Sequence, residues 1–114
     1  MKPAALLEVV VAALDDLKAV DIRALDVTAL TTITDYMVIA SGRSNRQVKA
    51  LAEHVEASAR SRGVRAIGTE GVETSEWILI DLGDVIVHVM QPETRDFYQL
   101  EKLWELPERA RKKI

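Results

Sequence analysis

The sequence predicts a single α/β domain, a sandwich in which a mixed five-stranded sheet is flanked by helices. Two segments, one near the start and one in the middle, carry apolar residues at steps of three and four, which is typical of helices packed on a core. Short runs of branched aliphatic residues lie between and after these segments, and such runs favour strands. A chain of 114 residues has the size of one domain with one core.

The first forty residues predict a helix and two strands. Residues 3–18 form the helix, because their apolar side chains fall on one stripe. That stripe consists of Leu6, Val9, Val10, Ala13, Leu14 and Leu17. Residues 21–27 predict a short strand, and residues 36–40 are continuously apolar, as in a strand that is covered on both faces.

The middle of the chain predicts a second helix with recognisable ends. Ser44 and Gln47 have the spacing of a capping box, in which each side chain satisfies a backbone N–H at the start of the helix. Gly63 is well placed for the left-handed backbone that follows a helix. The buried stripe is Val48, Leu51, Ala52, Val55 and Ala59. Residues 64–68 then predict a third strand.

The second half of the chain predicts two strands, a tight turn and a last helix. Residues 77–80 and 85–90 are the strands, and Gly83 supplies a positive φ in the turn at 81–84. The second of these strands is apolar on both faces, so we expect it to be internal. After Pro92 a helix follows, and helical spacing predicts that its apolar residues pack on the sheet. These residues are Phe97, Leu100 and Trp104. We expect a domain at 1–106 and a basic tail at 107–114.

Composition excludes several classes of protein. A net charge of −3 and a pI near 5.4 argue against a general nucleic-acid binder. The absence of cysteine rules out disulfides and thiolate metal sites and is compatible with a reducing cytoplasm. No apolar run approaches the roughly eighteen residues of a membrane span.

An acidic, aromatic segment predicts a surface that docks a basic partner. Glu70, Glu73 and Glu76 precede Trp77, and no Lys or Arg occurs from there until Arg95. Aromatic residues make up only 4% of the chain, yet they gather in this segment and in the helix that follows it. Exposed aromatics beside unpaired acids are typical of an interface with a basic protein. Trp77 fits an interface anchor and a core position equally well.

Two features also fit ligand sites, although simpler interpretations are favoured. Asp81 and Asp84 would chelate a divalent cation if Asp26 or Asp35 joined them, but aspartates in a turn usually bond to nearby N–H groups. The loop at 41–47 leads into a helix and carries two arginines, as some phosphate sites do. It has one glycine and lacks the Walker ending, so a capped turn is favoured.

No catalytic constellation emerges from the sequence. His88 lies between valines in a predicted strand, where a lone histidine is more often a hydrogen-bonded interior residue than a catalyst. No serine stands at a diagnostic spacing from a plausible base. We therefore expect neither catalytic nor metal-binding residues.

Three linked blocks resemble a known family. The segment at 34–55 (TDYMVIASGRSNRQVKALAEHV), the pair Glu70-Gly71, the segment at 77–90 (WILIDLGDVIVHVM) and the segment at 97–104 (FYQLEKLW) stand in the expected order. With the first helix they cover nearly the whole chain, which resembles a ribosomal silencing factor of the RsfS/Iojap family.

The resemblance implies a fold related to the nucleotidyltransferases and a cytoplasmic protein of bacterial type. Family members bind ribosomal protein fourteen of the large subunit, block subunit joining and repress translation when nutrients are short. The resemblance further implies a homodimer when free, no cofactor and no direct sequence-specific contact with nucleic acid. It places the partner-binding residues at Trp77, Asp81, Asp84, His88, Tyr98 and Glu101, to which the acidic surface adds Glu70 and Glu76.

Two other functions stay open at this stage. One is a small magnesium-dependent nucleotidyltransferase that uses Asp81 and Asp84. Against it, Ser41-Gly42 only resembles the glycine-serine loop of those enzymes, and the acidic pair that should follow is replaced by residues 47–49 (QVK). The other is an RNA-binding module, whose affinity would fall steeply with salt.

Overall fold

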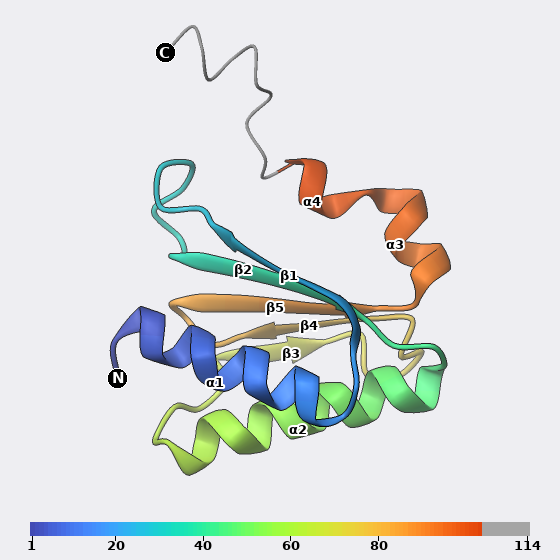
Figure 1. Cartoon of the computed structure of the whole chain (residues 1–114), viewed down its shortest axis with the longest axis horizontal. Coiled ribbons are helices and arrows are strands. Elements are labelled where there is room, and N and C mark those ends of the chain that lie inside the picture. Colours follow the sequence, from blue (N-terminus) through green and yellow to red (C-terminus); the bar gives the residue numbers. More distant parts are fainter. Residues whose placement is uncertain (104–114) are drawn as a thin grey trace, which may run out of the picture.

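A computed structural model describes residues 1–103 and contains one mixed sheet with helices on both sides (Figure 1). The elements are α1 (Pro3–Asp16), β1 (Val20–Asp26), β2 (Tyr36–Ser41), α2 (Asn45–Ser61), β3 (Gly68–Glu70), β4 (Trp77–Asp81), β5 (Val85–Met90), α3 (Pro92–Tyr98) and α4 (Leu100–Leu103). This order confirms the predicted α/β class and the five strands. The predictions for Trp104 and for the tail at 107–114 lie outside the described residues.

The sheet has the strand order β1-β2-β5-β4-β3. β2 and β5 pair in parallel, and the other neighbours are antiparallel. β5 therefore occupies the centre, which confirms the internal strand predicted from its two apolar faces. Along β5, Val85, Val87 and Val89 face α1 and α2, whereas the alternate residues face the other side.

The main core lies between the sheet and the pair of helices α1 and α2. Both helices cover the same face, and α3 with α4 lies on the opposite side of the sheet (Figure 1). The predicted stripes of both helices supply this core, except that Val9 and Leu17 are not among its fully buried residues. The strands contribute Val38, Ala40, Ile78, Ile80, Val85, Val87 and Val89.

Both ends of α2 follow from its sequence. The Ser44 hydroxyl accepts a hydrogen bond of 3.1 Å from the Gln47 N–H, as the predicted cap requires. The Gln47 side chain instead accepts from the Arg43 N–H at 2.7 Å, so the capping box is displaced by one residue. Gly63 follows the helix with a φ of +86°, as predicted.

Two predicted elements differ in the structure. The third strand predicted at 64–68 shares only Gly68 with the observed β3 (Gly68–Glu70), because its partner β4 ends opposite Gly68, at Asp81. The last helix is broken at Gln99, whose φ of +48° lies in the left-handed region. Because of this break, Phe97 and Leu100 do not lie on one helical face. Leu100 packs on the sheet, whereas the Phe97 side chain is 81% exposed. The prediction that Phe97 packs in the core was wrong.

Candidate partner-binding surface

The sheet face opposite α1 and α2 is only partly covered, and we call it the open face. It presents Trp77, Leu79 and Asp81 from β4, together with Ile86 and His88 from β5. In the ladder, Leu79 lies opposite His88 and Asp81 lies opposite Ile86. Leu79, Ile86 and Trp77 are half-buried, so this face offers apolar surface to the solvent.

Trp77 is the centre of an aromatic cluster that joins the open face to α3. Its indole Nε1 donates a hydrogen bond of 2.9 Å to His88 Nδ1. Its ring centroid lies 5.0 Å from that of Tyr98, and Tyr98 in turn meets Phe97 edge-on at 5.0 Å. Tyr98 and Phe97 are exposed. The cluster thus runs from a buried histidine to two aromatic rings in the solvent.

The loop before β4 is shaped by a glycine. Gly71 has a φ of +90°, and a Cβ added there would lie 1.9 Å from the Trp77 carbonyl oxygen. Only glycine lets this loop lie so close to the first residue of β4. The Glu70-Gly71 pair noted in the sequence therefore has a structural reason, which is to position Trp77.

Burial controls the protonation of His88. Its side chain is only 4% exposed, and desolvation lowers the pKa of His88 from 6.5 to about 4. Since Nδ1 accepts the indole hydrogen bond, the neutral ring carries its proton on Nε2. A second ring proton would place an N–H against the indole N–H, so the neutral form is the one that orients Trp77.

Acidic side chains border the open face. Glu70, on the edge strand β3, lies opposite Leu79 and is exposed, as are Glu76 and Asp84. Asp81 is half-buried, and its Oδ1 accepts from the Gly83 N–H at 2.8 Å, which is the turn chemistry weighed from the sequence. The residues predicted to bind a partner thus gather around β4 and β5 with α3 and α4.

Asp81 and Asp84 do not form part of a metal site in the described structure. Within residues 1–103 no group of three or more His, Cys, Asp or Glu side chains is arranged to hold a metal ion. The magnesium-dependent alternative therefore lacks the third ligand that Asp26 or Asp35 would have supplied.

In the same range, no helix is long and apolar enough to cross a membrane.

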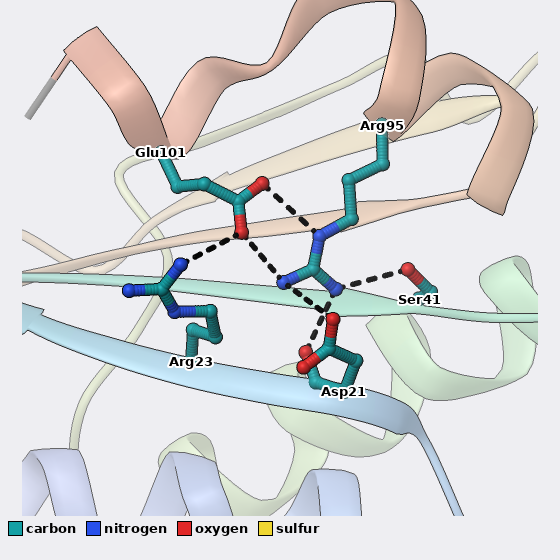
Figure 2. Close-up of polar contacts among 5 residues, drawn as sticks. All are labelled: Asp21, Arg23, Ser41, Arg95 and Glu101. Carbon is teal, nitrogen blue, oxygen red and sulfur yellow. Dashed lines mark hydrogen bonds and ion pairs between the residues drawn. The ribbon is translucent and has the colours of Figure 1, made fainter.

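Sequence reasoning missed one residue of this region, Arg95. It is 6% exposed and forms two hydrogen bonds to Glu101, of 3.2 Å from Nε and 2.9 Å from Nη2 (Figure 2). These contacts, and the charges of Arg95 and Arg23, lower the pKa of the Glu101 carboxyl against the opposing effect of its desolvation. The six-residue separation of Arg95 and Glu101 matches no helical spacing, so no sequence pattern indicated this pair.

An open sheet face that carries aromatic side chains and an acidic border has the composition of a protein-interaction surface. The family model described as "Ribosomal silencing factor during starvation" matches residues 1–114, and the chain belongs to this family. The resemblance stated from the sequence is thereby confirmed.

Relatives and a solved structure agree with this assignment. The chain is 51% identical over 92 residues to the ribosomal silencing factor RsfS of Chromobacterium violaceum, covering 81% of this chain and 75% of that protein. It is 46% identical over 100 residues to RsfS of Haemophilus influenzae, with coverages of 88% and 98%. A crystal structure of a Chromobacterium violaceum protein superposes with a TM-score of 0.90 at 44% identity, covering 95% of this chain and 92% of the other.

The His88 pKa predicts a pH-dependent stability. An unfolded chain binds the His88 proton below pH 6.5, whereas the folded chain binds it only near pH 4, so the unfolded state holds more protons in between. The free energy of unfolding should fall as the pH is lowered through this window, by roughly 3 kcal/mol in total from His88. Urea unfolding from pH 7 to pH 4 measures it.

The matched variant is His88→Asn, which does not titrate but keeps an oxygen that can accept from the indole N–H. The pH dependence of its free energy of unfolding should be smaller than that of the wild-type chain by about the same amount, because the buried imidazole is gone. Parallel pH profiles for the two proteins would contradict the assignment.

Proposed function

We propose that this protein binds the large ribosomal subunit through ribosomal protein fourteen, and that it does so with the open face and α3. The observation that carries the proposal is the exposed pair Phe97 and Tyr98 beside Trp77, on a face bordered by acids. Aromatic side chains of this kind are the usual anchors of protein interfaces. Membership in the family of ribosomal silencing factors supports the ribosome as the partner.

Charge supports a basic partner. The exposed acids Glu70, Glu76 and Asp84 lie near the open face, and the chain has no Lys or Arg from residue 70 until Arg95. Arg95 itself is buried, so it does not cancel this charge at the surface. A ribosomal protein that is rich in lysine and arginine would be attracted electrostatically to these acidic residues.

The proposed action is steric repression of translation under nutrient limitation. A factor bound on the joining face of the large subunit excludes the small subunit by its bulk, and no chemical step is needed. A Kd between nanomolar and micromolar, about −12 to −8 kcal/mol, suffices for this action. We accordingly propose a non-enzymatic protein that acts in the cytoplasm.

A homodimer of the free protein stays a prediction of the resemblance, and sedimentation of the purified protein tests it.

Sucrose gradients test the function directly. Added to separated subunits under joining conditions, the protein should co-migrate with the large subunit and reduce the peak of joined ribosomes. Binding to the small subunit alone would contradict the proposal. So would an unchanged profile when the protein saturates the large subunit.

Charge reversal tests the acidic border. Glu70→Lys should weaken binding to the large subunit by roughly 1 to several kcal/mol, because it places a like charge against a basic partner. Glu53→Lys is the matched control, since Glu53 is an exposed residue of α2 on the far side of the sheet. Titration at two salt concentrations measures both variants, and equal losses would contradict the placement of the interface.

Truncation of an exposed ring tests the aromatic anchor. Phe97→Ala should leave the free energy of unfolding within about 0.5 kcal/mol, because the ring is mostly in solvent. It should weaken binding by about 2 kcal/mol or more if the ring is an anchor. Ile33→Ala is the control, since Ile33 is 77% exposed in the loop between β1 and β2. Unchanged binding of Phe97→Ala would remove α3 from the interface.

A further inference from the structure

We infer that Arg95 and Glu101 form a latch that holds α3 and α4 against the sheet, and that Glu101 supports partner binding by positioning Tyr98 on Trp77 rather than by touching the partner. The inference rests on the proposed function only where binding is concerned. The latch itself is a property of the isolated chain.

The segment α3–α4 needs such an anchor because it is short and poorly packed. Its helices have seven and four residues, far below the length at which a helix is stable alone. Within α3, the one buried side chain is Arg95. Among the side chains that the structure describes, the half-buried Leu100 packs against a small cluster of Val27, Met37, Ile39 and Met90.

The Arg95 guanidinium ties together three parts of the chain. Nη1 donates to the Asp21 carbonyl at 2.7 Å and to the Ser41 hydroxyl at 3.0 Å, so it binds both β1 and β2 (Figure 2). Nε and Nη2 bind the two oxygens of Glu101 from α4. Asp21 lies in the β-bulge between Val20 and Arg23, with a φ of +51°, and its carboxylate is 3.6 Å from Nη2.

Glu101 faces inward as a result. The left-handed backbone at Gln99 reverses the direction of the chain, and this places Glu101 of α4 beside Arg95. A second cation, Arg23 of β1, lies 3.5 Å from the same carboxylate, whose side chain is only 13% exposed. A carboxylate engaged by two arginines in this way has little capacity left for an external partner.

The two exposed aromatic rings lie between the ends of the latch. Phe97 and Tyr98 follow Arg95 and precede Glu101, so closing the pair fixes the turn that carries them. Tyr98 then rests on Trp77 at 5.0 Å. Without the ion pair, this segment would become ordered only when the partner binds. The conformational entropy lost at that step would weaken the complex.

Hydrogen exchange of the isolated protein tests the latch. Glu101→Gln keeps the shape of the side chain but removes its charge, and it should raise amide exchange in residues 96–103 at least tenfold while leaving α2 unchanged. Asp96→Asn is the matched control, because it removes an exposed carboxylate from the neighbouring helix α3. Unchanged exchange in Glu101→Gln would overturn the latch, whatever the binding result.

A double-mutant comparison separates positioning from contact. Glu101→Gln, Arg95→Lys and the double variant are titrated against large subunits; lysine keeps the charge of Arg95 but not the paired hydrogen bonds. If both residues act through the latch, the double variant should bind no more than about twofold worse than the weaker single variant. Losses that multiply would assign Glu101 a contact of its own. If the wild-type chain binds no large subunit, the proposed function fails, while the exchange experiment still decides the latch.

Discussion

The whole structure depends on the burial of β5 on both of its faces. Its valines join the core beneath α1 and α2, and its alternate residues Ile86, His88 and Met90 build the opposite side. One strand therefore serves both sides of the sheet: its valines close the helical core, and on its other face His88 accepts the hydrogen bond of Trp77.

Much of this arrangement was predictable because it follows from local patterns. The stripes of α1 and α2, the Ser44 cap, the glycine after α2 and the internal character of β5 are each encoded within a few residues. The later start of β3 was not predictable, because it depends on where β4 ends. The break at Gln99 was missed because a non-glycine residue in the left-handed region has no sequence signature as clear as glycine.

The sequence singled out the residues of the candidate surface but not the contacts among them. Trp77 and the acids near it stood out by composition, and the family resemblance added Tyr98 and Glu101. The hydrogen bond from Trp77 to His88 joins neighbouring strands, and the contacts of Arg95 span residues 21 to 101. Such contacts depend on tertiary geometry. They also occupy two of the expected binding residues, the buried His88 and the half-buried Glu101, with partners from this chain.

The parallel pairing of β2 with β5 has a consequence for synthesis. Residue 36 pairs with residue 85, so the sheet cannot close around its centre until residue 85 has left the ribosome. Until then β2 and the helix after it expose apolar surface with only local partners, which is the situation that slows folding and invites chaperones. A member of a family of ribosomal silencing factors thus completes its own sheet only after its ribosome has synthesised and released residue 85.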